Sequence, residues 1–230
     1  MTKRNFYAET AYLLGVVILA FGTSLMTTAD LGLSMIVAPA YLLHLKLSKT
    51  FSFFSFGMAE YTLQAVLILL TILIVRKFKL SYLFSFFTAI LYGFLLDGAL
   101  FLISLLPEVI TTMISVRILF YTVGFIINTA AISLLFHTYI SPEAYELIVK
   151  EISRKFHFDI SKTKTVYDCL SLLLSVVLSF SFFGLWQFEE ISIGTLLCTL
   201  LNGPFIGLFT RFFEKRFSFT DRFPFRKYFE

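Results

Sequence analysis

Ionisable and amide side chains inside long apolar stretches are the residues of this sequence whose types could do chemistry. Asp97 lies within the apolar run 81–105, and Asn202 lies within a second run, 191–210. A charge at membrane depth costs free energy, so such a residue is a candidate for binding a substrate, an ion or a proton. We therefore expect Asp97 and Asn202 to line a central small-molecule site, although both positions are also compatible with simple helix packing.

A second polar group is expected around Glu60. Glu60 and Gln64 are four residues apart and share one helix face, which an antiparallel neighbour carrying Asp97 could approach near the outer membrane surface. Both are predicted to bind substrate, and His44 could join them. The residues predicted to gate the site or to couple it to protons are Asp168, Asp30 and His44, with capping of the segment after residue 30 as the structural alternative for Asp30.

Two glycine motifs predict interruptions in the helices. Asp97-Gly98 corresponds to Asn202-Gly203-Pro204 in the second run. Proline lacks the N–H of a helix hydrogen bond and clashes with the preceding turn, so a kink or break is expected there. The freed carbonyl groups could coordinate a substrate or a cation. Alternatively, Gly98 and Gly203 only allow helices to pack closely.

The composition requires a membrane. Hydrophobic residues make up 58% of the 230 residues and charged residues 15%, with 30 phenylalanines and a mean hydropathy of +0.85. A soluble domain of this length needs more charge on its surface, and a disordered chain needs lower hydrophobicity. No zinc, nucleotide-binding or hydrolase motif occurs, and the histidines and two cysteines are dispersed. We expect no enzyme activity, no cofactor, no metal and no nucleic-acid partner.

A single all-α transmembrane domain, 1–230, is predicted from six apolar stretches long enough to cross the bilayer. The predicted spans are 8–28, 55–75, 81–105, 114–138, 165–187 and 191–210.

Basic residues set the predicted orientation. With both termini in the cytoplasm, all of the 19 lysines and arginines except Lys46, Lys49 and Arg117 fall on the cytoplasmic side. Counting the short apolar segment 31–45 as a seventh span would reverse this distribution, so it is predicted to be re-entrant or interfacial. The C-terminal segment 211–230 is predicted to be a basic cytoplasmic tail.

The two halves, 8–105 and 114–210, are predicted to be inverted repeats. Each has three crossings and one short segment after the first crossing, and similar landmarks recur at a nearly constant offset. In the second half this segment is an amphipathic helix, 141–156, opened by Ser141-Pro142-Glu143. Its basic face is expected to lie against anionic lipid on the inner leaflet.

Several of these residues resemble a known family. The run Ala29-Asp30-Leu31-Gly32-Leu33-Ser34, the run Ile193-Gly194-Thr195-Leu196-Leu197 and the acidic position Asp168 resemble the YczE/YitT-like bacterial integral membrane proteins. Met35 is a departure, because many relatives have proline there. The resemblance implies a multi-span helical bundle in a bacterial cytoplasmic membrane and little about activity.

The function expected from these features is that of a small-molecule permease or a substrate-binding membrane component. Its partners would be the lipid bilayer, a small molecule or ion, and a second copy or another membrane protein. The alternative is an accessory protein that does not transport but stabilises a partner complex. If the first hypothesis holds, Asp97→Asn is expected to abolish uptake while the protein still folds.

Overall fold

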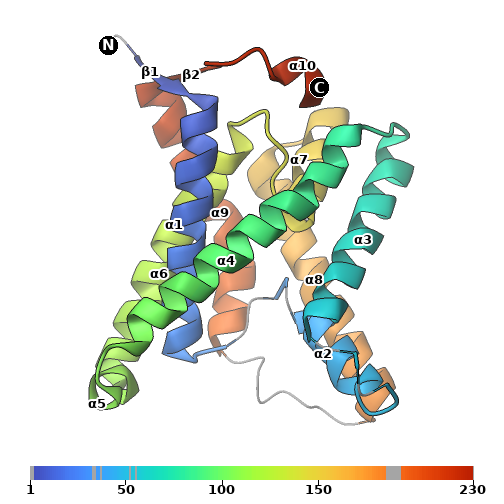
Figure 1. The fold of residues 1–230 in the computed structure, drawn as a ribbon, viewed down its shortest axis with the longest axis vertical. Helices are drawn as coiled ribbons and strands as arrows, with labels where there is room; N and C mark the ends of the chain where they lie inside the picture. Colours follow the sequence, from blue (N-terminus) through green and yellow to red (C-terminus); the bar gives the residue numbers. More distant parts are fainter. Residues whose placement is uncertain are drawn as a thin grey trace.

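The protein is an all-α bundle with six helices that are long and apolar enough to cross a membrane (Figure 1). The computed structural model describes residues 3–32, 35–36, 38–51, 53–54, 56–184 and 193–229. The six helices confirm the predicted fold class. They are α1 (Ala8–Ala29), α3 (Phe56–Val75), α4 (Phe84–Ser104) with its leading turn η1 (Leu80–Leu83), α6 (Ile114–Phe136), α8 (Ile160–Phe183) and α9 (Ile193–Arg216).

Four short helices and a small sheet complete the described chain. The helices are α2 (Ala38–Leu47), α5 (Glu108–Thr112), α7 (Ala144–Phe156) and α10 (Arg226–Phe229). Strand β1 (Arg4–Tyr7) pairs in parallel with β2 (Phe217–Thr220), which joins the two ends of the chain. Both termini therefore lie at the same end of the bundle, whereas α2 and α5 lie at the opposite end (Figure 1). The sheet was not predicted.

Close packing of α1 against α6 depends on two glycines. A methyl group at Gly22 would lie 3.0 Å from the Gly124 carbonyl oxygen, and one at Gly124 would lie 2.7 Å from the Gly22 carbonyl oxygen. Small residues let membrane helices approach until backbone meets backbone. One turn further on, Asn128 Nδ2 donates a hydrogen bond to Thr23 Oγ1 at 2.9 Å, so this crossing is held by shape and by a polar contact.

Helix α7 packs against α3, and its first half is buried in the bundle. At its start Tyr145 bonds with Glu60, in the second turn of α3, and near its end Lys155 Nζ donates to the Ile74 carbonyl oxygen at 2.7 Å. Ile74 lies at the end of α3 that is nearer to the two chain termini, and Glu60 lies near the opposite end of α3. Helix α7 therefore runs from the bundle interior toward the face that carries the termini. On the face expected to be basic, Glu151 is buried whereas Arg154 and Lys155 are exposed, so contact of this face with anionic lipid stays a prediction.

Helix α8 begins earlier than predicted, at Ile160 and not at residue 165. Asp159 is its N-cap, and its side chain accepts a hydrogen bond from the Lys162 N–H at 3.0 Å, which satisfies one unpaired donor of the first turn. This start places Lys164, which the predicted span 165–187 leaves outside, inside the helix and fully buried.

The predicted helix breaks do not occur, and the kink expected as their alternative at Pro204 stays a prediction. α9 continues through Pro204 to Arg216, and α4 continues through Gly98. Ser161 Oγ donates to the Gly203 carbonyl oxygen at 2.6 Å, beside the proline, and such contacts allow proline inside membrane helices.

The alternative explanation, that these glycines allow helices to pack closely, is confirmed for Gly203. A methyl group there would lie 2.5 Å from the Ser161 carbonyl oxygen. This explanation does not hold for Gly98, which has open space around it.

Some predicted boundaries lie outside the described residues. These are the start of the span 55–75, the end of the span 165–187, the start of the span 191–210, and residues 33, 34 and 37 of the segment 31–45. Residues 211–216 of the predicted tail belong to α9, and the rest of its described part forms β2, a short connection and α10.

Candidate functional site

Four helices bring polar side chains together inside the bundle. We name this set the acidic cluster: Glu60 and Gln64 on α3, Glu143 and Glu146 at the start of α7, Lys164 and Asp168 on α8, and Asn202 on α9. Gln64, Glu143, Glu146, Lys164, Asp168 and Asn202 are all buried. Glu60 is half-buried, and its Oε1 atom is covered.

The centre of the cluster is a buried ion pair. Lys164 Nζ lies 2.9 Å from Asp168 Oδ1 and 3.5 Å from Glu146 Oε1, and the side chains of Lys164 and Asp168 have no exposed surface. The two residues are four apart on α8, which puts them on one helix face. Asn202 Nδ2 donates to Asp168 Oδ2 at 2.9 Å, so α9 contributes to holding the carboxylate in place. A buried ion pair needs such extra hydrogen bonds to offset desolvation.

The second part of the cluster joins α3 to α7. Tyr145 OH donates to Glu60 Oε2 at 2.5 Å, and Gln64 lies one turn further along the same face of α3. In this second part of the cluster, the covered acceptor atoms Glu60 Oε1, Gln64 Oε1 and Glu143 Oε1 have no hydrogen-bond partner. A buried acceptor without a partner costs about 1–3 kcal/mol, and all three atoms would accept a hydrogen bond from a cationic donor.

The charges of the cluster do not balance. Four carboxyl groups, those of Glu60, Glu143, Glu146 and Asp168, share one lysine. Burial raises the pKa of Glu143 well above its usual value, and the nearby Glu146 and Glu60 raise it further. Burial also raises the pKa of Glu146, although Lys164 opposes the change. The arrangement thus favours keeping a proton on α7.

Four of the predicted site residues meet in the cluster. Asn202, Glu60, Gln64 and Asp168 lie together, although Asp168 was predicted to gate from the inner side. Asp97 does not join them, because it is exposed on α4. The structure therefore does not bring Asp97 and Asn202 together in one central site: Asp97 is exposed on α4, whereas the buried Asn202 of α9 donates to Asp168 of α8.

Asp30 and His44 make their described contacts elsewhere. Asp30 ends α1 in a left-handed conformation (φ 49°), and its Oδ2 lies 3.1 Å from Arg117 Nη2. His44 Nδ1 lies 2.9 Å from the Phe54 carbonyl oxygen, which ties α2 to the connection before α3. Both contacts hold the ends of helices: Asp30 ends α1 and pairs with Arg117, and capping of the segment after residue 30 stays a prediction.

Sequence reasoning missed Lys164, Glu143, Glu146 and Tyr145. Two signals were available. Glu143 is four residues before Leu147, so it shares the apolar face of α7 and not its basic face. Lys164 and Asp168 have the spacing of a helical ion pair, but this becomes apparent only once α8 is known to begin at Ile160.

The described residues include no group of three or more His, Cys, Asp or Glu side chains placed to hold a metal ion. The acceptor oxygens of the cluster instead suit a proton or an ammonium-type cation, each of which is bound through hydrogen bonds.

Comparison with known proteins identifies a family. A family model described as a family of unknown function (DUF6198) matches residues 6–211, which include the whole acidic cluster. The chain belongs to the DUF6198 family. No curated protein and no solved structure matches the chain. The expected likeness to YczE/YitT-like proteins is thus replaced by membership of DUF6198, and no comparison connects the two by name.

Proposed function

We propose that this DUF6198 protein is a small-molecule permease in which the acidic cluster binds a small organic cation, such as an amine, in exchange with protons. The observation that carries the proposal is the excess of carboxyl groups over lysine in the interior. Four ionised carboxylates beside one ammonium group would be too costly in a low-dielectric interior. A proton or a cationic substrate therefore has to be present, and the two can replace each other.

The position of the cluster supports binding inside the bilayer. Asp168 lies about two turns into α8 from the face that carries the termini, and Glu143 and Glu146 lie at the buried start of α7. Ionisable residues at this depth are typical of substrate and proton pathways. The N-terminal end of a helix also carries a partial positive charge, which favours the carboxylate forms of Glu143 and Glu146 and opposes the effect of burial.

We further infer that the two halves are inverted repeats. The order of long and short helices is the same in both halves: α1, α2, α3 and α4 correspond to α6, α7, α8 and α9. The short helices also make matching contacts with the other half. Lys155 of α7 bonds with Ile74 at the end of α3, and Lys46 of α2 donates to the Phe182 carbonyl oxygen at the end of α8 at 3.2 Å.

An inverted repeat gives a permease two alternative states of similar energy, one open to each side. In this interpretation α7 and α2 are the corresponding gating elements, one near each face. We infer from the distribution of basic residues that the face with both termini is cytoplasmic. A bacterial cytoplasmic membrane is what the resemblance to the YczE/YitT-like proteins implies, and it stays a proposal.

Ligand-dependent stability tests the binding claim. The thermal unfolding midpoint of the purified protein would be measured with methylammonium, choline and putrescine, and with neutral alcohols of matched size. Bound cation raises the midpoint, and Glu60→Gln removes this rise because the buried acceptor loses its charge. Asp97→Asn is the matched control: it also removes a carboxylate from a spanning helix, but one outside the cluster, and it keeps the rise.

Two results would overturn the proposal. One is a midpoint that no tested cation changes at any pH between 5 and 9. The other is a rise of equal size in the wild type and in Glu60→Gln. Either result, with a folded protein, would favour the alternative role as an accessory protein of a membrane complex.

A further inference from the structure

A second polar site lies at the face that carries the termini, separate from the acidic cluster. It is a pocket of about 410 Å³ beneath the C-terminal segment. Its lining is rich in hydroxyl and basic groups, and includes Ser81, Thr138, Lys150, Arg154, Ser153 and Arg226. Pockets that bind small molecules have volumes from about 300 Å³ upward, so the space suits a small polar ligand.

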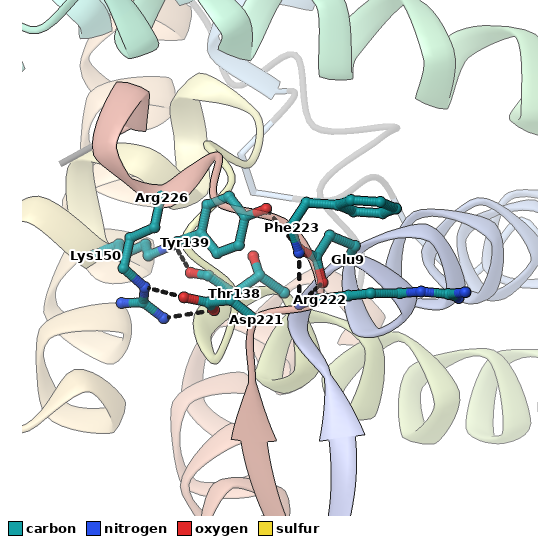
Figure 2. A network of polar contacts seen from close by, with 8 residues as sticks. All are labelled: Glu9, Thr138, Tyr139, Lys150, Asp221, Arg222, Phe223 and Arg226. Carbon is teal, nitrogen blue, oxygen red and sulfur yellow. Dashed lines mark hydrogen bonds and ion pairs between the residues drawn. The ribbon is translucent and has the colours of Figure 1, made fainter.

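The C-terminal segment covers part of the pocket. We name residues 217–229, which contain β2 and α10, the terminal strap. β2 pairs with β1, and the backbone N–H groups of Arg222 and Phe223 donate to the Glu9 carboxylate at 2.9–3.2 Å. Ser81 Oγ donates to the Phe229 carbonyl oxygen at 3.0 Å. The strap thus brings Arg226 into the lining of the pocket, where it lies beside Tyr139 (Figure 2).

Lys150 forms the floor of the pocket. Its Nζ atom donates to the carbonyl oxygens of Thr138 at 2.6 Å and Ile140 at 3.3 Å. An ammonium group has three donors, so one remains for a ligand. Figure 2 shows Lys150 and Arg226 on the same side of Tyr139, whereas Arg222 points away from them.

The charge around the pocket is positive. Glu151 accepts a hydrogen bond from Tyr82 OH at 2.6 Å and lies 3.6 Å from Lys79, and Asp221 forms a two-point ion pair with Arg226 at 2.6 and 3.0 Å. These two carboxylates are outnumbered by the basic side chains around the pocket, Lys79, Lys150, Arg154 and Arg226. Burial lowers the pKa of Lys150 to about 8; Glu151 opposes the change, and Arg154, Arg226 and Lys79 add to it.

We propose that this pocket binds a phosphate ester, with Lys150 and Arg226 holding the phosphate and the terminal strap closing over it. Arginine and lysine together with hydroxyl groups are the usual partners of phosphate oxygens. The volume exceeds the needs of a bare phosphate ion and leaves room for a small polar group attached to it. A ligand bound here contacts both the strap and α7, so its binding is expected to order the strap.

Two sources could supply this chemistry: a soluble phosphate ester, or the headgroup of an anionic phospholipid. The experiment uses the full-length protein in detergent with glycerol 3-phosphate, and in lipid nanodiscs made with phosphatidylglycerol or with phosphatidylcholine alone. The readouts are the thermal unfolding midpoint and the rate of amide hydrogen exchange in residues 217–229. Sulfate at equal ionic strength is the control for nonspecific charge.

Protection of the strap by glycerol 3-phosphate would identify a soluble ester, and protection by phosphatidylglycerol alone would identify a lipid headgroup. In both cases the effect should be lost in Arg226→Gln and Lys150→Gln, and kept in Arg222→Gln. If Lys150→Gln does not fold, Arg226→Gln still decides, because it changes only the strap. The proposal is overturned if neither probe slows exchange in the strap, if sulfate acts equally, or if Arg226→Gln responds as the wild type does.

Discussion

At the scale of single residues, Lys164 and Asp168 show how a buried charge is kept in this protein. Neither side chain touches solvent, and each has a second partner: Glu146 for the lysine and Asn202 for the aspartate. Loss of one partner of such a pair leaves the other charge in a low-dielectric environment. The effect of replacing either residue on the free energy of unfolding therefore depends on whether its charged partner is still present.

Asp168→Asn is expected to lower the free energy of unfolding by about 3–5 kcal/mol, because Lys164 then keeps only the more distant Glu146 as a counter-charge. Asp97→Asn should change it by less than about 0.5 kcal/mol, as for an exposed substitution without close partners. Equilibrium unfolding in mixed micelles would measure both values. The double variant Lys164→Gln/Asp168→Asn should lose less free energy of unfolding than the single variants Lys164→Gln and Asp168→Asn lose together. A loss equal to the sum of the two single losses would contradict the pairing.

Glu143 makes stability depend on pH. Because its pKa is raised in the folded protein, its contribution to stability is full at a pH below its ordinary pKa. That contribution disappears as pH rises through the raised value. The wild-type unfolding midpoint should therefore fall toward alkaline pH, and Glu143→Gln should flatten this fall because glutamine cannot lose a proton. Thermal scans from pH 5 to pH 9 test this, and an equal slope in both proteins would show that Glu143 is not the group concerned.

At the scale of the helices, the contact of α8 with α9 is set by Gly203. Added volume there would meet the Ser161 carbonyl oxygen, whereas Gly98 on α4 has open space. Gly203→Ala should destabilise the protein, by an amount typical of overpacking, about 1–3 kcal/mol. Gly98→Ala should be neutral or slightly stabilising, because alanine is the better helix former. A greater loss from Gly98→Ala than from Gly203→Ala in the same unfolding assay would contradict this packing.

The long helices could be predicted from the sequence because hydrocarbon thickness alone sets their length. The route of α7 could not, since an amphipathic helix fits the membrane surface as well as a protein interior. Its place is decided by tertiary contacts, such as Tyr145 with Glu60 and Lys155 with Ile74. The strand pair β1–β2 was missed for the same reason, as Arg4 and Phe217 are far apart in the chain.

The candidate site could be predicted only in part. Glu60, Gln64, Asp168 and Asn202 were found because a polar residue in an apolar run is conspicuous. Asp97 met the same criterion and is exposed, because apolar flanks do not reveal which face of a helix points inward. Lys164 was left outside the predicted span 165–187, since the start of a membrane helix is poorly defined when polar residues fill its first turns.

At the scale of the whole molecule, the even number of crossings brings both termini to one face. Cysteines introduced singly at Lys77 and Lys162, in a protein with Cys169→Ser and Cys198→Ser, should both react with an impermeant thiol reagent from that face. A cysteine at Thr50 should react only from the other face. These three positions are exposed. Labelling of Lys77→Cys and Lys162→Cys from different faces would contradict both the topology and the inverted repeat.

Proton movement through the acidic cluster is the central claim, and proton flux in proteoliposomes measures it directly. A pH-sensitive dye inside the vesicles would report flux after putrescine is added outside. We expect putrescine-dependent flux in the wild type and in Asp97→Asn, and none in Glu60→Gln. Flux that persists in Glu60→Gln, or that Asp97→Asn alone abolishes, would contradict the account.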